Sequence, residues 1–325
     1  MQAIRLTLRQ LQIFTAVARR GSTTAAGQEL SLSQSATSAA LNELERVLDL
    51  QLFDRAGKRL MLNDNGRMLL PRALALLDNA IEIERLGHGL AGMPPPLRLG
   101  ASTTIGNYVL PRILPPYLGQ WHAQDIGHWH YTVMIGNTAE VCRQVADFEL
   151  DIGLIEGSCH EPELIALAWL RDELQIVSSP AMVEKWRSGG SDPRRAPVGG
   201  GRNTVPTALL REQVWLLRER GSGTREAVAA ALLPEFHSYQ RSIELGSSEA
   251  IKRAVAEGLG VACLSQWVVA DMLLNGQLAR VQTTLPVIMR QCHIVLHRQK
   301  RASDGLRKFI DHVSDAALQG ALVAA

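Results

Sequence analysis

The sequence has only four cysteines, and they are widely scattered. They stand at Cys142, Cys159, Cys263 and Cys292, each within an apolar run, and no C-x-x-C pair occurs. This pattern is typical of buried thiols in a reducing cytosol rather than of a disulfide framework. The first residues lack the apolar region of a signal peptide, and no apolar run approaches the length of a membrane span. We therefore expect a cytoplasmic protein without a membrane partner.

Motifs of catalysis and metal binding are lacking as well. Gly221-Ser222-Gly223 is glycine-rich but lacks the lysine of a nucleotide-binding P-loop, and neither G-x-S-x-G nor H-E-x-x-H occurs. His128 and His130, with His122 nearby, supply only half of a metal site, so a surface loop is favoured there. We expect no catalytic residue, no metal and no cofactor.

What the sequence does have is the ordinary composition of a globular protein. Its 325 residues are 46% hydrophobic and 20% charged, which suits two or three domains with a proper core. The formal net charge is only +2, so any affinity for nucleic acid must come from a local patch. Residues 1–62 carry eight basic residues against five acidic ones. This local excess of positive charge is modest, and it makes the N-terminal end the candidate for binding nucleic acid.

The stretch 21–45 has the pattern of two short helices joined by a tight turn. Ser22 and Ser33 each stand where a side-chain oxygen can accept from the first turn of a helix, and good helix formers follow both. Four residues at helical spacing form the buried face of the second helix: Thr37, Leu41, Leu44 and Leu48.

The opposite face of that second helix carries small and amide side chains. A major groove accepts such a face, because bulky side chains would hold the helix away from the base edges. Taken alone, this helix is better explained as a solvated surface helix of a bundle, and its neighbours are what favour a recognition helix. Together with cap and hairpin residues, the candidate DNA-binding residues are Ser22, Thr24, Ser33, Gln34, Ser35, Ser38, Asn42, Arg55, Lys58 and Arg59.

A further helix and a basic hairpin flank this pair. Thr7 and Gln10 match a capping box for a first helix that ends near Gly21. Residues 52–62 form two strand-like pieces around a glycine-containing turn with basic residues at its tip. Three helices and a basic hairpin predict a winged helix-turn-helix, whose wing can lie against phosphates or a minor groove. A plain turn with solvated charges explains the hairpin alone equally well.

A long helix is expected after the hairpin. Asn63 can cap it, and an apolar stripe that includes Leu70 and Leu77 extends it to about Leu90. Roughly 27 residues span ~40 Å, more than a small N-terminal domain covers, so a partner helix and a dimer are expected. Pro71 either bends this helix or marks a restart. Glycines and prolines in residues 87–96 then predict a linker.

From Leu97 onward strand and helix patterns alternate, which indicates an α/β fold with largely parallel sheets. The predicted strands are Leu97–Ala101, Tyr131–Gly136, Asp151–Glu156, Leu174–Ser178, Val214–Arg218, Ser242–Gly246, Val261–Ser265 and Val287–His297. Helices are predicted between them, for example at Ala139–Phe148, Thr224–Leu233 and Glu249–Glu257. Residues 188–203 indicate a glycine-rich surface loop. Ser303–Leu318 has the pattern of an amphipathic helix docked on the body.

Several short segments share their order and spacing with one family of regulators. They are Leu8-Arg9-Gln10-Leu11, Gly21-Ser22, Ala25-Ala26, Ser33-Gln34, Leu44-Glu45, Leu52-Phe53-Asp54-Arg55, Leu99 to Tyr108, Asp151 to Gly157, Gly221 to Arg225 and Gly246 to Ile251. On these segments the chain resembles the LysR-type transcriptional regulators over essentially its whole length. Within that family it is similar to the branch with the regulators of sulfur assimilation and of carbon dioxide fixation.

The resemblance implies a domain organisation. Residues 1–63 would form the winged helix-turn-helix, residues 64–92 the linker helix that dimerises, and residues 93–325 an effector domain. That domain would be bilobed like a periplasmic solute-binding protein, with two Rossmann-like lobes. Lobe one would hold about 95–165 and 268–300, and lobe two about 166–267. The resemblance also implies tetramers that bend DNA, and contact with RNA polymerase.

Two strand-to-helix turns supply candidate effector residues. Ser102-Thr103-Thr104 and Ser222-Gly223-Thr224-Arg225 each offer hydroxyls and unpaired N–H groups at a positive helix end. An anion is the natural guest there, although plain N-capping explains each hydroxyl without a ligand. If the lobes face each other, the candidates lining one cleft are Ser102, Thr103, Thr104, Asn137, Ser222 and Thr224. By resemblance, Ser102, Thr104 and Thr224 match effector-contacting positions of the sulfur-assimilation regulators.

Three functions compete at this point. The leading one is a sequence-specific DNA-binding regulator, whose DNA-bound oligomer responds to a small anionic metabolite between the lobes. That metabolite would be an oxyanion, a carboxylate or a phosphorylated compound, and the partners would be double-stranded DNA and further copies of the chain. A non-catalytic solute-binding module is one alternative, which the basic hairpin disfavours. An α/β enzyme is the other, which the lack of a nucleophile–base pair disfavours.

Overall fold

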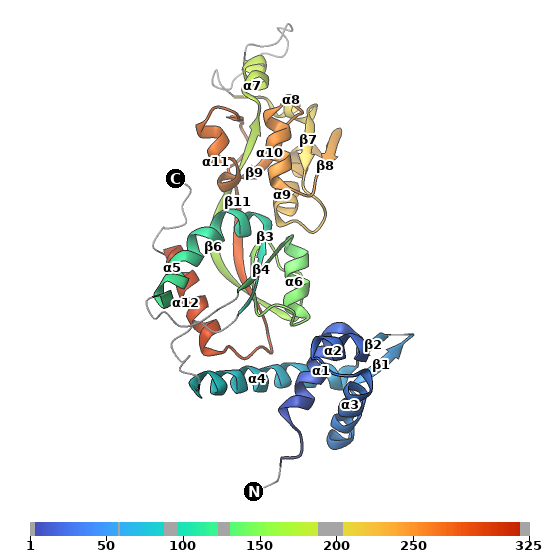
Figure 1. Cartoon of the computed structure of the whole chain (residues 1–325). Helices are drawn as coiled ribbons and strands as arrows, with labels where there is room; N and C mark the ends of the chain where they lie inside the picture. Colours follow the sequence, from blue (N-terminus) through green and yellow to red (C-terminus); the bar gives the residue numbers. More distant parts are fainter. Residues whose placement is uncertain (1–3, 58, 88–96, 123–130, 188–203, 319–325) are drawn as a thin grey trace.

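The computed structural model describes residues 4–57, 59–87, 97–122, 131–187 and 204–318. Figure 1 shows a small N-terminal unit, a long helix that leaves it, and two lobes stacked above that helix. The lobe next to the long helix is lobe one, and the other is lobe two. The predicted loop at 188–203 and the predicted linker at 88–96 lie outside the described residues.

The N-terminal unit is a winged helix-turn-helix. Its elements are α1 (Leu8–Arg20), α2 (Thr23–Glu29), α3 (Gln34–Leu48), β1 (Phe53–Ala56) and β2 (Arg59–Leu62). The two strands pair antiparallel, with Phe53 opposite Leu62. One apolar core that includes Leu11, Phe14 and Leu44 holds the helices together. The hairpin predicted from residues 52–62 is therefore confirmed.

Local side-chain chemistry sets the ends of these helices. Thr7 and Gln10 form the expected capping box at the start of α1, and Gly21 ends that helix with a φ of 62°. The Ser22 hydroxyl accepts from the Ala25 N–H at the start of α2, and the Ser33 hydroxyl from the Ala36 N–H at the start of α3. The predicted starts of all three helices are confirmed.

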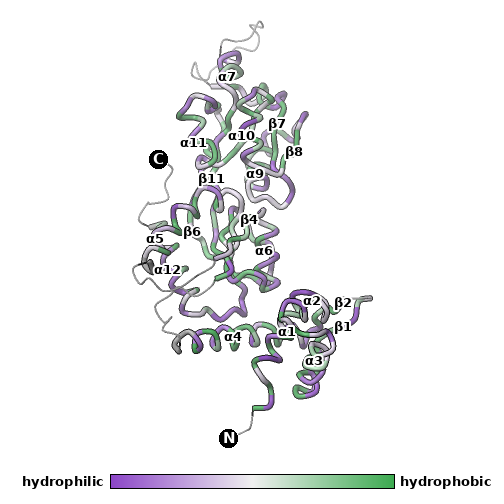
Figure 2. The backbone as a smooth tube through the Cα atoms, in the orientation of Figure 1, coloured by the Kyte–Doolittle hydropathy of each residue, from purple (hydrophilic) through white to green (hydrophobic). Residues whose placement is uncertain are grey.

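The long helix α4 (Asp64–Gly87) begins where the sequence indicates. The Asn63 side chain accepts from the Gly66 N–H at 3.0 Å, and the helix continues through Pro71 without a restart. Figure 2 shows hydrophobic and hydrophilic residues alternating along its length. Leu76 and Ile83, which are seven residues apart and so share one face of the helix, are exposed in the single chain. Such an apolar stripe far from the N-terminal core fits a partner helix.

The rest of the chain builds the two lobes. Lobe one contains β3 (Arg98–Ser102), the π-helix η1 (Ile105–Val109), α5 (Leu110–His122), β4 (Thr132–Gly136), α6 (Thr138–Ala146), β5 (Ile152–Glu156) and α12 (Asp304–Leu318). Lobe two contains α7 (Pro180–Arg187), α8 (Thr207–Arg211), β7 (Val214–Leu217), α9 (Gly223–Phe236), β8 (Arg241–Glu244), α10 (Ser248–Ala256), β9 (Ala262–Ser265), α11 (Gln266–Leu274) and β10 (Ala279–Arg280). Two long strands, β6 (Leu164–Ser178) and β11 (Ile288–His297), run through both lobes (Figure 1).

The sheets are more mixed than the sequence suggested. The main sheet has the order β10-β6-β11-β5-β3-β4, with β9 also paired to β6. β3 runs parallel to β4 and β5, and β7 runs parallel to β8. However, β11 is antiparallel to both β5 and β6, and β9 is antiparallel to β6. The expectation of largely parallel sheets is wrong here, because the chain crosses between the lobes along β6 and returns along β11.

The lobes are joined by a narrow neck made of residues 171–173 and 289–291. In this neck Asp172 lies directly opposite Arg290 in the β6–β11 ladder. β9 pairs only with residues 174–177 of β6, and β5 pairs only with residues 292–295 of β11. Apart from one hydrogen bond, from the Gly157 N–H to the Gln291 carbonyl at 3.0 Å, the described ladder is therefore two strands wide at the neck, and it widens into a sheet on either side.

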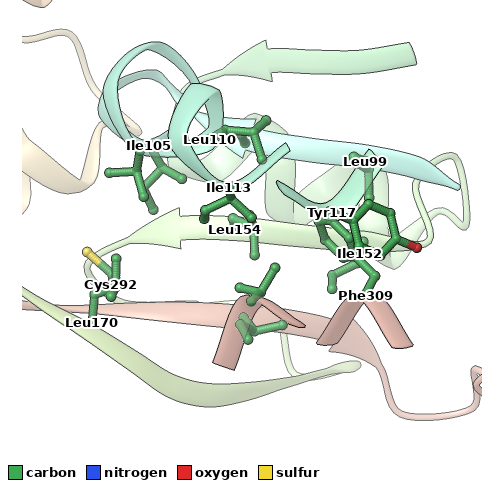
Figure 3. Close-up of a cluster of buried hydrophobic side chains, with 14 of the residues drawn as sticks. Leu99, Ile105, Leu110, Ile113, Tyr117, Ile152, Leu154, Leu170, Cys292 and Phe309 are labelled. Atoms are coloured by element: carbon green, nitrogen blue, oxygen red, sulfur yellow. The ribbon is translucent and has the colours of Figure 1, made fainter. Parts of the chain in front are cut away.

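Each lobe has its own apolar core. In lobe one α12 packs on α5. The rings of Tyr117 and Phe309, both labelled in Figure 3, lie edge to face with their centroids 5.1 Å apart. The predicted C-terminal amphipathic helix is thus confirmed. In lobe two Val268 and Leu278 pack with Ile251. Residues 268–287, which the sequence analysis assigned to lobe one, accordingly belong with lobe two, and only β11 returns the chain to lobe one.

Lobe one also contacts the linker helix directly. Phe148, which has a left-handed φ of 57°, joins the apolar cluster that contains Leu70 and Ala73 of α4. The Lys300 ammonium donates to Asp78 of α4 at 3.0 Å and to Asp151 of lobe one at 2.8 Å. An apolar side chain and a largely buried ion pair therefore join the effector domain to α4.

Candidate DNA-binding face and effector site

The outer face of α3 is open to solvent. Gln34, Ser35 and Asn42 are exposed and Ser38 is partly exposed, whereas Thr37, Leu41 and Leu44 face the core. The Gln34 amide donates to the Ser38 hydroxyl at 2.9 Å and to the Thr23 hydroxyl at 3.4 Å. These hydrogen bonds orient the amide along the same face. An exposed polar strip of this kind is the surface that a recognition helix presents to a major groove.

The remaining DNA-binding candidates lie around that face. Thr24 is exposed, and the hydroxyls of Ser22 and Ser33 are used as helix caps. On the wing Arg55 and Arg59 are exposed. Lys58 lies outside the described residues.

The turn after β3 already holds a carboxylate. Glu156, the last residue of β5, places its Oε1 atom 2.6 Å from the Thr104 N–H and 3.2 Å from the Ile105 N–H. Its side chain is 2% exposed. The positive end of the helix that follows Ser102 is therefore filled by an anion of the chain itself.

The predicted hydroxyls gather around this carboxylate. The Ser102 hydroxyl accepts from the Glu156 N–H at 3.0 Å, and the Thr224 hydroxyl donates to Glu156 Oε2 at 3.3 Å. Thr224 belongs to α9 of lobe two, so the two turns do meet across the lobes. Ser102, Thr104 and Thr224 are all buried.

Arg290 joins this group to the neck. Its Nη1 atom lies 2.9 Å from Glu156 Oε2 and donates to the Thr224 hydroxyl at 2.7 Å, and its Nη2 atom lies 3.5 Å from the Thr104 hydroxyl. Its other edge pairs with Asp172 at 2.6 Å. One guanidinium thus faces two carboxylates, and Glu156, Arg290 and Asp172 form a buried interlobe cluster with one excess negative charge.

The two carboxylates of the interlobe cluster differ in acidity. Burial raises the pKa of Glu156, but Arg290 and the hydrogen bonds outweigh burial, so its pKa lies below the usual value. For Asp172 burial prevails over Arg290 and raises the pKa. The Asp172 carboxylate also accepts from the Ser265 hydroxyl at 2.9 Å. The pKa shifts of the two carboxylates therefore have opposite directions.

The other effector candidates have structural partners. Asn137 caps α6 by accepting from the Glu140 N–H, and Ser222 caps α9 by accepting from the Arg225 N–H. The capping interpretation therefore describes Ser222, and Asn137 is likewise a helix cap. The Thr103 hydroxyl donates to the Gly136 carbonyl at 3.0 Å and accepts from Arg218 Nη2 at 3.3 Å.

Sequence reasoning missed the charged members of this site. Glu156, Asp172, Arg290 and Arg218 are all buried, and each stands in or beside an apolar strand. Charged residues in such strands are rare unless they are paired, and that was the available signal. In the part of the chain that the structure describes, no group of three metal-ligating side chains occurs, and no helix has the length and apolarity to cross a membrane. His128 and His130 lie outside that part.

Comparison with known families matches both parts of the chain. Residues 8–67 match the bacterial regulatory helix-turn-helix protein, lysR family, and residues 91–318 match the LysR substrate binding domain. An uncharacterized HTH-type transcriptional regulator YeiE of Escherichia coli K12 is 45% identical over 96% of this chain and 98% of its own. The regulator CysL of Bacillus subtilis is 31% identical over 83% of this chain and 84% of its own. The RuBisCO operon transcriptional regulator of Allochromatium vinosum is 29% identical over 96% and 97%.

Solved structures show the same fold. ArgP from Mycobacterium tuberculosis has a TM-score of 0.69 at 18% identity and covers 96% of this chain and 98% of that chain. A full-length OxyR variant from Pseudomonas aeruginosa has a TM-score of 0.66 at 21% identity, with 97% and 95% covered. CbnR complexed with its target DNA has a TM-score of 0.54 at 18% identity, with 96% and 100% covered.

Proposed function

Because the chain belongs to the LysR family of transcriptional regulators, we propose that a small anion bound between its lobes controls how it acts on DNA. The chain is a DNA-binding regulator with a separate effector-binding domain, and its named relatives are regulators rather than enzymes. The class of effector and the way its binding is transmitted are our proposals.

The position of Glu156 carries the proposal. Its carboxylate accepts two backbone N–H bonds at a helix start and one charged bond from Arg290. These are the bonds that a carboxylate, sulfate or phosphate group would accept in the same place. The site is therefore built for an anion, and in this state the chain supplies one itself.

Charge balance decides how an outside anion would enter. The interlobe cluster already has two carboxylates against one guanidinium, and a further buried negative charge would be strongly disfavoured. An effector anion must therefore replace the Glu156 side chain rather than bind beside it. This exchange keeps the charge at the helix start and moves a carboxylate out of the cluster.

A series of contacts connects the site of this exchange to the DNA-binding unit. Arg290 and Asp172 face each other in the neck, so a change around Arg290 acts where the lobes join. Lobe one is in turn joined to α4 through Phe148 and Lys300. Coupling requires that the effector bind one lobe arrangement better than the other. We also infer that the chain dimerises through α4, assembles into a tetramer, and acts with RNA polymerase in the cytoplasm.

On DNA, we propose that the α3 face reads the major groove through Gln34, Ser35, Ser38 and Asn42. The exposed wing residues Arg55 and Arg59 would contact phosphates. Small side chains allow α3 to approach closely, and the polar strip on its outer face supports this assignment.

A binding comparison of Glu156→Gln with the natural chain tests the effector site. Thermal shifts would be measured with sulfate, acetylserine, phosphoglycerate and citrate. The variant no longer presents a competing carboxylate, so the dissociation constant of the bound anion should fall about ten-fold or more, as expected for loss of a charged hydrogen-bonding competitor. Glu140→Gln, an exposed carboxylate on α6, should change nothing. Equal dissociation constants for the natural chain and Glu156→Gln would contradict the proposal.

A further inference from the structure

Beside the interlobe cluster lies a second buried arginine, Arg218, with a carboxylate of its own. We propose that Arg218 is a second anion subsite, so that the effector carries two anionic groups rather than one. This inference rests on the proposed function, because it assigns a second group of the same effector. The Arg218 subsite consists of Arg218, Glu219, Thr103 and Ser248.

The geometry of Arg218 is that of a binding arginine. Its side chain is 2% exposed, and it follows β7 directly in lobe two. Nη1 donates to the Ser248 hydroxyl at 2.8 Å, and Nη2 donates to the Thr103 hydroxyl of lobe one at 3.3 Å. Nε and Nη2 donate to the two carboxylate oxygens of Glu219 at 2.7 and 2.8 Å. The guanidinium thus binds the Glu219 carboxylate through two hydrogen bonds and contacts residues of both lobes.

Glu219 occupies the place that an effector group would take. A bidentate pair, with two parallel N–H···O hydrogen bonds, is the arrangement in which arginine recognises carboxylates and phosphates. The Glu219 side chain is 24% exposed, so solvent reaches Glu219 far more than it reaches Arg218. Burial raises the pKa of Glu219, but Arg218 and Asn137 bring it below the usual value. As at Glu156, the chain's own carboxylate is held in place of an outside anion.

The buried side of the Arg218 subsite carries a second cationic side chain. Ser248 is the first residue of α10, whose cap is Ser247. Lys252, one turn along α10, is buried and donates to the Tyr108 hydroxyl of lobe one at 3.3 Å. The carboxylates that balance Lys252 are on Glu249 and Asp271, and their side chains are 37% and 61% exposed. The cations of this subsite are therefore the buried groups, and a bound anion would meet their positive charge at the inner wall.

The two arginines contact neighbouring residues of one turn of the chain. The Thr103 hydroxyl accepts from Arg218, and the Thr104 hydroxyl lies 3.5 Å from Arg290. Consecutive Cα atoms are about 3.8 Å apart, so the two guanidinium groups contact the same short segment. A molecule with two anionic groups separated by a few bonds can replace Glu156 at one and Glu219 at the other. A single small anion can replace only one of them.

The test compares two classes of anion on the full-length chain. One-headed probes carry a single anionic group, and two-headed probes carry two anionic groups joined by a short linker. Titration calorimetry would use acetate and inorganic phosphate as one-headed probes, and malonate, succinate and phosphoglycolate as two-headed probes. We expect at least one two-headed probe to bind about ten-fold tighter than either one-headed probe, since a charged hydrogen bond contributes at least that factor.

Glu219→Gln is the decisive variant, because the amide keeps its size and removes the competing charge. It should tighten the two-headed probes several-fold, whereas a one-headed probe that binds in the place of Glu156 should be unchanged. Glu235→Gln, an exposed carboxylate on α9, serves as the control and should change neither. Arg218→Lys should weaken the two-headed probes to the level of the one-headed ones.

The outcomes separate this inference from the proposed function. If Glu156→Gln tightens binding but Glu219→Gln does not, the first anion site stands and the Arg218 subsite is overturned. One-headed probes that bind as tightly as all two-headed probes would overturn it as well. If neither Glu156→Gln nor Glu219→Gln alters the binding of any probe, the proposed function and this inference both fail.

Discussion

Replacement of Asp151 by asparagine should destabilise the contact between lobe one and the linker helix by a measurable amount. The Asp151 carboxylate accepts from the Arg98 guanidinium at 2.7 Å and from the Lys300 ammonium at 2.8 Å. Lys300 in turn holds Asp78 of α4. Asparagine keeps the shape of the side chain but loses the charge that both cations face.

The size of the effect follows from the acidity of Asp151. Burial alone would raise its pKa, but Arg98 and Lys300 lower it from 3.8 to about 2. At about 1.36 kcal/mol per pH unit, this difference corresponds to about 2 kcal/mol of unfolding free energy at pH 7. Because the folded pKa is the lower one, this contribution is present above pH 3.8 and is lost as the pH falls through about 2. About half should be gone near pH 3.

Urea denaturation of the natural chain and of Asp151→Asn, at several pH values, measures this contribution. The difference in unfolding free energy should be about 2 kcal/mol at pH 7 and should shrink steadily toward pH 3. Asp147→Asn is the control, because its pair with Arg143 is exposed and should contribute less than about 1 kcal/mol. A difference that is the same at pH 7 and pH 3 would refute the reasoning, since it would not come from the ionised carboxylate.

Three further outcomes are expected. Ser38→Asp places a charge against the groove and should abolish specific footprints while the melting temperature stays unchanged; retained footprints would mean that the α3 face is misassigned. Phe148→Ala removes a buried ring from the cluster with Leu70 and should cost about 3 kcal/mol of unfolding free energy, with faster hydrogen exchange in the first half of α4 as the second readout. Affinity for promoter-sized DNA should fall steeply as salt rises, and Arg59→Gln should reduce that slope by about one phosphate contact; a flat response would contradict a wing that binds phosphates.

The helix ends could be predicted from the sequence because their causes are local. Ser22 and Ser33 each cap an N–H three residues on, and Asn63 does the same for α4. The sulfur and carbon dioxide regulators named by resemblance also occur among the relatives. Short-range chemistry and motif order were sufficient for these conclusions.

The charged part of the effector site could not be predicted in the same way. Glu156 and Arg290 are 134 positions apart, and Asp172 and Arg290 are 118 positions apart. Only the crossing of β6 and β11 brings them together, and no local pattern encodes the direction in which a crossing strand runs. For the same reason the lobe boundary near Val268 was misplaced, because an apolar helix such as α11 carries no local mark of the core it joins.

The two-stranded neck limits the kinds of motion open to the lobes. A hydrogen-bonded ladder resists separation and stretching, but two-stranded ribbons are the most strongly twisted β structures because no third strand flattens them. Residues 171–173 and 289–291 are such a ribbon, with Arg290 at its centre. Relative movement of the lobes should therefore be a rotation about the axis of the ribbon, with little change in their separation. An effector that rotates the lobes would then alter the angle at which α4 and the DNA-binding unit are held, and so the curvature imposed on the double helix.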